Sequence, residues 1–419
     1  MIMNKLTIKL HPDTKAIFHF LPVLTVCFIA FIGISIPLPI LTPLILQENS
    51  HFFSLQTTLE LKKFYLGLAL ASYPLGEFIG SPILGTLSDK FGRKRMLMLG
   101  QIGTSIGYFF TGYFIYKGMF TALLISRFLT GICEGTVSIA QAYIADLAPV
   151  HLKSRLFGLV TVAICMGYVV GPILGGIFGG LQSTISLTYP FILVGILGLF
   201  LSLGIKIFLV QDIKPTSEKN YLQAQVSDNI LYKVKFILSN LEYKYLLLAS
   251  TFSSMGITLY VEFFSGHLNQ KWNWKIKELS IFWIYVSIVW GVVAFFIHVG
   301  EKRFSAYFRG ILSLLLAAIC LFLIPHIDVS PMLMMTIPLC YGMAISSTIL
   351  SILISNTIDE QYQGIGLGIR NSIRVLGDAI CCFLGGQLFA HTFHLPFSVG
   401  SMLLLLSIYF IIKSKKGRI

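Results

Sequence analysis

Charged residues are scarce in this sequence. Only 12% of its 419 residues are Asp, Glu, Lys or Arg, whereas 55% are hydrophobic. A soluble globular domain carries about 25% charged residues. The composition therefore excludes a soluble enzyme or a soluble binding domain, and it predicts an all-α polytopic membrane protein.

Common motifs of catalysis and metal binding are also absent. The sequence contains neither a Gly-x-x-x-x-Gly-Lys-Ser/Thr phosphate loop nor a His-Glu-x-x-His metal site. The seven cysteines all lie in apolar segments and form no Cys-x-x-Cys pair, so we interpret them as packing residues. We therefore expect a protein that is not an enzyme and that needs no metal and no cofactor. A membrane-embedded enzyme and a non-transporting receptor remain alternative classes.

Long apolar runs recur along the chain, and a run of about 20 residues suffices to cross a bilayer. Twelve such runs are present, at 18–46, 64–87, 96–116, 119–147, 156–180, 187–211, 245–268, 279–299, 310–325, 332–357, 365–391 and 397–412. The longest polar stretch separates the sixth run from the seventh. We therefore predict twelve transmembrane helices in two six-helix, pseudo-symmetric halves, an arrangement typical of secondary transporters. The expected boundaries are 1–211 for the N-terminal half, 212–244 for a cytoplasmic central loop and 245–419 for the C-terminal half.

Positive charges are distributed unevenly between the two ends of these helices. If the N-terminus is cytoplasmic, 22 of the 31 Lys and Arg residues fall on the cytoplasmic side and six on the other side. Lys and Arg accumulate in cytoplasmic loops, so we expect both termini in the cytoplasm. This orientation signal accounts for the formal charge of +13, so we expect a lipid bilayer and no nucleic acid as partner. We expect no cleaved signal peptide.

Two glycine-containing motifs have a distinctive spacing. The turn between the second and third apolar runs reads Gly85-x-x-x-Asp89-x-x-Gly92-Arg93-Lys94-Arg95. Glycines there permit close helix approach and a sharp reversal. The fifth run ends with glycines four residues apart and a proline that is expected to kink the span: Gly167-x-x-x-Gly171-Pro172-x-x-Gly175-Gly176.

Together these motifs resemble the major facilitator superfamily over nearly the whole chain. Arg127-Phe-Leu-Thr-Gly131 is similar to the helix-four motif of that family. Tyr143-Ile-Ala-Asp146-Leu-Ala-Pro149, followed by Arg155, is similar to the pattern of proton-coupled drug antiporters, including the tetracycline-resistance group. The resemblance implies a monomeric, proton-coupled exporter of small molecules in the inner membrane of a bacterium. It also implies that a cytoplasmic charge cluster latches the halves in the outward-facing state and breaks on opening inward: Asp89, Arg93, Asp146 and Arg155.

Ionisable residues inside the predicted helices are the candidates for substrate binding and proton coupling. There are seven: Glu77, Arg127, Glu134, Glu262, Arg370, Arg374 and Asp378. Each costs roughly 2.5–3.5 kcal/mol in lipid, so each should face a cavity or a partner. Glu134 is the first candidate proton carrier, because it lies near mid-membrane among apolar neighbours. Glu77 and Glu262 come next, and Asp378 can be occupied by Arg374.

Helical spacing groups these charges into two stripes. Arg127, Glu134 and Gln141 recur every seven residues, with Ser138 beside them, and form one predicted stripe. Arg370, Arg374 and Asp378 recur every four residues and form the other. Either Arg374 and Asp378 neutralise each other, or the arginines present forked donors to an anionic substrate, with Arg127, Ser138 and Gln141 as further binding residues.

Two departures from the drug-antiporter pattern bear on the substrate. No acid lies between Asp13 and Glu48, so we expect no proton carrier in the first helix. Two arginines occupy the eleventh helix, which is usually apolar in drug exporters. They support the alternative that the protein moves a hydrophilic anion, such as a carboxylate-rich siderophore or metabolite, in either direction.

Overall fold

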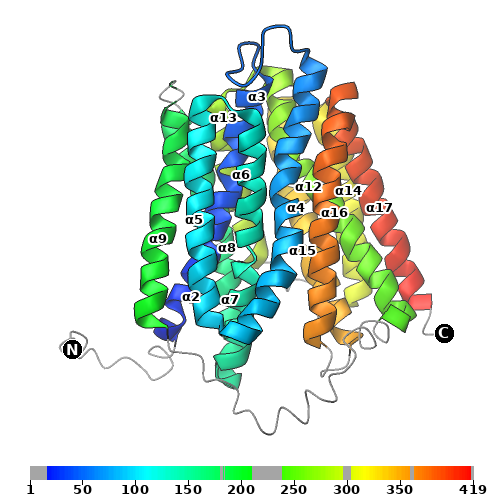
Figure 1. Ribbon diagram of the computed structural model, residues 1–419. Helices are drawn as coiled ribbons and strands as arrows, with labels where there is room; N and C mark the ends of the chain where they lie inside the picture. Colours follow the sequence, from blue (N-terminus) through cyan, green and yellow to red (C-terminus); the bar gives the residue numbers. More distant parts are fainter. Residues whose placement is uncertain are drawn as a thin grey trace.

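The computed structural model describes residues 17–179, 183, 185–209, 238–295, 303–358 and 363–416. Long helices form almost all of this part of the chain, and it contains no strand (Figure 1). The N-terminal half contains α2 (Leu21–Ser35), α3 (Pro37–Leu46), α4 (Leu59–Phe91), α5 (Arg93–Lys117), α6 (Phe120–Cys133), α7 (Thr136–Leu147), α8 (Val150–Gly179), η1 (Ser186–Thr188) and α9 (Tyr189–Phe208). The C-terminal half contains α12 (Leu241–Trp272), α13 (Ile276–Phe295), α14 (Ala306–Leu323), η2 (Ile324–His326), α15 (Val329–Asn356), α16 (Gln363–His391) and α17 (Leu395–Lys416).

Ten helical spans in the described residues are long and apolar enough to cross a membrane. They include α2 with α3 as one span, and α6 with α7 as another. The remaining two predicted spans are α4 and α5, which are long helices rich in Gly, Ser and Tyr. These small or weakly polar residues lower the mean hydropathy of α4 and α5, although both stand in the bundle like the others (Figure 1). The observed helices are consistent with the predicted twelve. Most of the predicted central loop, residues 212–237, lies outside the described residues.

The helix-five motif packs α8 closely against the first span. A Cβ atom on Gly171 would lie 1.9 Å from Ser35 Oγ, and one on Gly167 would lie 2.7 Å from the Phe28 carbonyl oxygen. The Ser35 hydroxyl donates a hydrogen bond to the Gly167 carbonyl at 3.2 Å. Neither glycine position therefore leaves room for a side chain in this packing.

The rest of the motif reaches other neighbours of α8. Cβ atoms on Gly175 and Gly176 would lie 2.9 Å from Pro39 Cγ of α3 and 2.7 Å from Ser280 Cβ of α13. Pro172 lies inside α8, which continues through it from Val150 to Gly179. The run of glycines thus serves two interfaces, one inside the N-terminal half and one with the C-terminal half.

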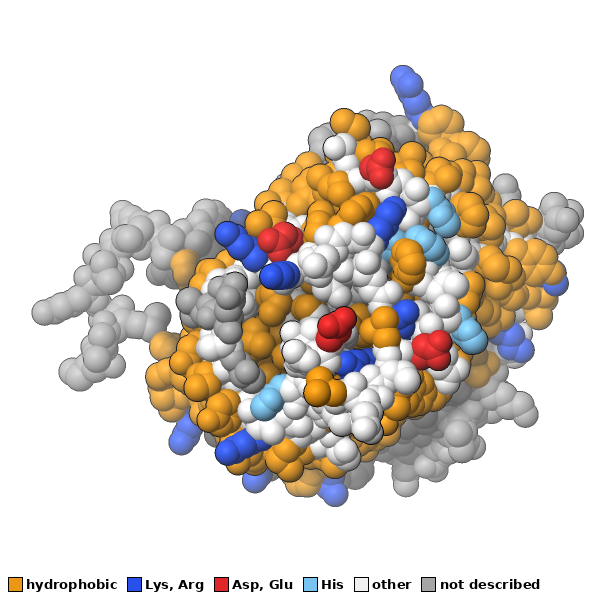
Figure 2. Space-filling model, turned by 90° about the horizontal axis from the view of Figure 1, so that it is seen from above, with side chains coloured by type: hydrophobic (Ala, Val, Ile, Leu, Met, Phe, Trp, Pro, Cys, Tyr) orange, Lys and Arg blue, Asp and Glu red, His pale blue; other side chains and the backbone are white. Residues whose placement is uncertain are grey.

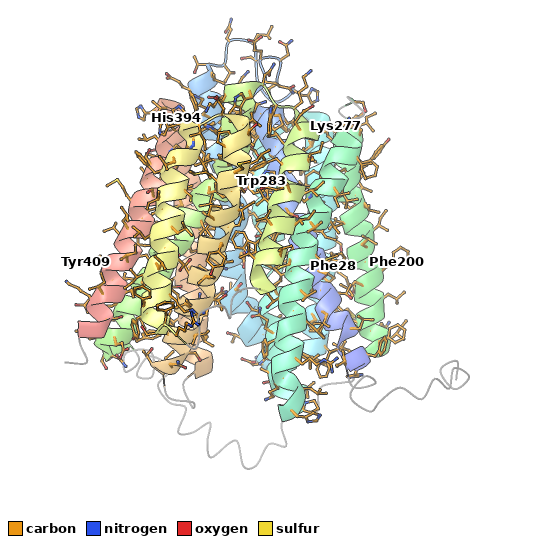
Figure 3. All side chains as sticks on the ribbon, turned by 180° about the vertical axis from the view of Figure 1, so that it is seen from behind. Phe28, Phe200, Lys277, Trp283, His394 and Tyr409 are labelled. Carbon is orange, nitrogen blue, oxygen red and sulfur yellow. The ribbon has the colours of Figure 1, made fainter. Side chains whose placement is uncertain are left out.

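The two halves meet mainly through α4 with α16 and α8 with α13. We call the end of the bundle that carries Gly92 the basic-turn end, and the end that carries Gly118 the opposite end. Near the opposite end, a Cβ atom on Gly67 would lie 2.7 Å from the Gly386 Cα atom. The rings of Phe64 and Phe383 also meet there, with centroids 6.0 Å apart. Figure 2 looks onto this end and shows side chains packed over its middle. Toward the basic-turn end, the helices of the two halves diverge (Figure 3).

Candidate functional site

Charges from both halves come together in the middle of the bundle. Glu77 of α4 interacts electrostatically with Arg374 and Asp378 of α16. Arg127 of α6 interacts electrostatically with Glu262 of α12. Both interactions cross from one half to the other, although sequence spacing had placed these residues only on separate helices. Such groups are expected to find partners or water, because an isolated charge is costly within a membrane.

Arg374 and Asp378 form the self-neutralising pair. Arg374 Nη1 donates to Asp378 Oδ2 at 2.7 Å. The other carboxylate oxygen accepts hydrogen bonds from Ser254 and Thr258 of α12, both at 2.8 Å. Arg374 Nε and Nη2 donate to Asn371 Oδ1 at 3.3 and 3.1 Å. The forked donors predicted for an anionic substrate are therefore engaged within the protein, and both oxygens of Asp378 are occupied.

Arg370 lies one helical turn nearer the basic-turn end. Its Nε donates to Ser250 Oγ of α12 at 2.9 Å, and its side chain keeps partial exposure. It forms no ion pair with a residue that the structure describes. Of the two arginines of α16, Arg370 is thus the one with fewer protein contacts on its guanidinium.

Arg127 is held against α4. The side chain is buried, its Nε donates to the Ala69 carbonyl oxygen at 3.2 Å, and its guanidinium lies 5.4 Å from the centroid of the Tyr73 ring. A cation over an aromatic face is attracted by the ring quadrupole. These contacts fix Arg127 while leaving its charge within reach of Glu262.

The predicted stripe of Arg127, Glu134 and Gln141 crosses an interruption of the fourth span. α6 ends at Cys133 and α7 begins at Thr136, and the Glu134 amide donates to the carbonyls of both Thr130 and Gly131. This tight turn changes the rotational register. Glu134 is buried, whereas Gln141 is exposed and Ser138 is half-buried. The structure brings neither Ser138 nor Gln141 into hydrogen-bond contact with the central charges.

Glu134 lies inside the N-terminal half. Only 3% of its surface is exposed, and its Oε2 has no hydrogen-bond partner among the described residues. Glu77 lies within electrostatic reach of it. Glu134, which the sequence suggested first as the proton carrier, thus lies beside the central charges and does not face the other half.

Tyr168 of α8 is a further residue near the central charges, and the sequence did not single it out. It lies within electrostatic reach of Glu262 and Arg374, and its ring is 5.2 Å from that of Phe31. Its carbonyl oxygen accepts a hydrogen bond from the Ser287 hydroxyl of α13 at 3.0 Å. Its position could have been noticed in the sequence, because Tyr168 is a polar aromatic residue directly after Gly167, in a motif that was expected to pack closely against other helices.

The predicted charge cluster forms in part. Arg93 Nη2 lies 2.6 Å from Asp89 Oδ1, and Arg93 Nε lies 3.2 Å from Asp146 Oδ2. Arg93 Nη1 also donates to the Ser88 hydroxyl at 2.6 Å. Arg155 is exposed and forms no ion pair within the described residues. Asp89, Arg93 and Asp146 therefore join α4, α5 and α7, all within the N-terminal half.

This cluster differs from the expected latch in two respects. It does not connect the two halves, and it is intact while the halves diverge at its own end of the bundle (Figure 3). In the predicted orientation this arrangement faces inward, so inward opening does not break the cluster. Gly92 has a φ of 95°, which suits glycine at the reversal. The close approach expected at Gly85 is absent here, because a Cβ atom there would meet no heavy atom within 4 Å.

Known proteins are similar to this chain in sequence and in fold. A model of the Major Facilitator Superfamily matches residues 23–382. The quinolone resistance protein NorA of Staphylococcus aureus (strain COL) is 27% identical over 372 residues, covering 86% of this chain and 87% of NorA. The class C tetracycline resistance protein of Escherichia coli is 35% identical over 182 residues, covering 43% of this chain and 42% of that protein. The xylose transporter XylE of E. coli, solved in an inward-open conformation, has a TM-score of 0.71 at 16% identity and covers 96% of this chain and 95% of its own. The family model spans most of the sequence and the fold agrees with it, so the chain belongs to the major facilitator superfamily of membrane transporters, which are not enzymes.

Proposed function

We propose that this transporter exports positively charged, drug-like compounds in exchange for protons. The observation that carries the proposal is the Arg374–Asp378 pair, which removes one arginine from the central charges. Glu77 acts on this pair, which carries no net charge, and Glu262 acts on Arg127, so these five groups carry one excess negative charge when both carboxylates are ionised. A cation or a proton can relieve that excess. The resistance proteins NorA and class C tetracycline resistance protein support export of a drug.

Exchange is expected if substrate and proton compete for the same carboxylates. A protonated Glu77 or Glu262 attracts a cation less than its ionised form does, because the Coulomb term is lost. Binding of the cation therefore favours release of the proton, and protonation favours release of the cation. We place this cycle in the inner membrane of a bacterium, in a monomer with both termini cytoplasmic, as the loop charges predict.

A second candidate substrate class is a hydrophilic anion, carried in either direction. Arg370 favours it, because its guanidinium has one hydrogen bond to Ser250 and no ion pair with a described residue. Arg374 supports this alternative less, since Asn371 and Asp378 engage its donors.

Thermal-shift measurements on the purified protein distinguish the two substrate classes. We expect the cation tetraphenylphosphonium to raise the melting temperature and citrate to leave it unchanged. Outside the Arg374–Asp378 pair, three intramembrane acids (Glu77, Glu134 and Glu262) exceed two arginines (Arg127 and Arg370). Arg370→Ala should leave the cation effect unchanged. If citrate stabilises the protein and Arg370→Ala abolishes that effect, the anion alternative is correct. Cation flux driven by a pH gradient in proteoliposomes separates transport from a receptor role.

We also propose that the cluster of Asp89, Arg93 and Asp146 keeps the N-terminal half rigid as it moves. Three helices are joined through one guanidinium, so the half can rotate as a unit about its contacts with the other half. This replaces the expected latch between halves with a brace inside one half.

Asp89→Asn tests the brace. Arg93 then loses its only ion pair with α4 among the described residues and keeps the weaker hydrogen bond to Ser88, so the brace is weakened. We expect substrate binding to be unchanged and turnover to fall several-fold. Asp89 is largely exposed, so the loss of folding stability should stay below about 1 kcal/mol. Binding is measured by thermal shift and turnover by flux in proteoliposomes. Lys90→Gln, on the same turn, is the control, and normal turnover of Asp89→Asn would count against the brace.

A further inference from the structure

Three polar side chains meet inside the N-terminal half, with the Tyr73 hydroxyl between the other two. They are Glu134 at the break between α6 and α7, Tyr73 of α4 and Tyr108 of α5, and each is at most 5% exposed. Glu134 Oε2 and both phenol oxygens are buried and unpaired among the described residues. Leaving a buried polar atom unpaired costs about 1–3 kcal/mol. The three groups have one another as neighbours, and one added proton on Glu134 would supply the donor that this group of oxygens lacks.

The three groups are near one another and near few other charges. Glu134 lies within electrostatic reach of both tyrosines, and the two tyrosines interact with each other. The other titratable groups that face Glu134 are Cys27 of α2, Glu77 of α4 and the adjacent Cys133. Arg127 lies beyond the Tyr73 ring and donates to Ala69, not to Glu134.

A proton fits this site better than a metal ion does. The described residues contain no group of three His, Cys, Asp or Glu side chains placed to hold a metal. A metal cation would also be repelled by Arg127. A proton on Glu134 removes a buried charge and creates a hydroxyl donor for a phenol oxygen, so it satisfies the site with the atoms already present.

Glu77 provides a route between this site and the central charges. It lies one helical turn from Tyr73 on α4, and it acts electrostatically on both Glu134 and the Arg374–Asp378 pair. The Glu77 carboxylic acid can give its proton to the Tyr73 oxygen while the Tyr73 hydroxyl proton passes to the Glu134 carboxylate. Glu77 then loses one proton, Glu134 gains one, and Tyr73 is unchanged.

We propose that Glu134, Tyr73 and Tyr108 form a proton-binding chamber inside the N-terminal half, loaded through Glu77 and separate from the substrate. Within the described part of the chain, the titratable groups that face Glu134 all belong to the N-terminal half, so a proton can remain there while substrate occupies the central charges. The role in coupling rests on the proposed function, whereas the existence of the chamber does not.

Infrared difference spectroscopy of the reconstituted protein, titrated from about pH 5 to about pH 9, detects the chamber directly. We expect a carboxylic-acid carbonyl band that disappears in Glu134→Gln, persists with saturating tetraphenylphosphonium and shifts in Tyr73→Phe. Glu60→Gln, which alters an exposed acid of α4, should leave the band unchanged. A spectrum that is identical in the wild type and Glu134→Gln overturns the proposal, and so does loss of the band when the cation binds. If Glu134→Gln does not fold, Tyr73→Phe decides, because an unshifted band excludes the phenol partner.

Transport measurements test the role of the chamber separately. Glu134→Gln should lose accumulation driven by a pH gradient and retain exchange of labelled for unlabelled cation. Full uphill transport by this variant would remove Glu134 from coupling. If the wild type itself shows no flux driven by a pH gradient, the proposed function fails, while the infrared result still decides whether the chamber exists.

Discussion

Glu262→Gln is expected to abolish accumulation of substrate against a gradient while leaving a slow downhill flux. Glu262 faces Arg127 across the boundary between the halves, and Arg127 is 6% exposed. The described residues include no ion pair between these two side chains, so they act on each other through charge at longer range, and Glu262→Gln leaves Arg127 without this opposing charge. A neutral amide also carries no exchangeable proton. We therefore expect transport driven by a pH gradient to fall to the level measured without a gradient.

The measurement uses proteoliposomes with an imposed pH gradient and a labelled cation. Glu278→Gln, an exposed acid in the first turn of α13, is the matched control and should behave as the wild type. Combining Glu262→Gln with Arg127→Gln should recover part of the lost thermal stability, because no unpaired charge remains, but none of the coupling. Retained accumulation by Glu262→Gln would contradict the assignment.

Structural features that depend on the spacing of residues within one helix or one turn could be predicted from the sequence. Runs of apolar residues predicted the helices, and the interval of four residues between Arg374 and Asp378 offered their pair as one of two alternatives, the one that the structure shows. The turn at Gly92 and the contacts of Arg93 with Asp89 and Asp146 could be expected from the motif. In each case, one helix, one turn or a known family pattern contained the whole relationship.

Contacts between distant segments could not be predicted in the same way. Glu77 meets Arg374 only because α4 packs on α16, and no periodicity within either helix encodes that packing. The break between α6 and α7 was also unforeseen, because the stripe through Glu134 was drawn on one continuous helix. Sequence periodicity assumes an unbroken helix, and the Glu134-Gly135 step interrupts it.

Gly67→Leu is expected to stop transport by preventing closure at the opposite end. α4 and α16 cross there at backbone distance, and a Cβ atom on Gly67 would lie 2.7 Å from Gly386 Cα and 3.0 Å from the Cys382 carbonyl oxygen. Backbone atoms cannot move aside as a flexible side chain can, so a leucine must separate the two helices. Overpacking of this kind costs about 1–3 kcal/mol. The penalty applies only to the state in which the halves touch at this end.

Because the penalty affects only the state that is closed at the opposite end, we expect Gly67→Leu to shift the equilibrium between the two states and not to unfold the protein. A penalty of about 3 kcal/mol on one state changes a two-state equilibrium by about a hundredfold, so the state open at the opposite end should dominate. The native Cys382, which is 1% exposed, should then react with a membrane-impermeant maleimide from that side, in a variant that lacks the other native cysteines. Gly204→Leu is the control, since no heavy atom lies within 4 Å of a Cβ placed there. Wild-type transport by Gly67→Leu, with Cys382 still protected, would contradict the expected shift between states.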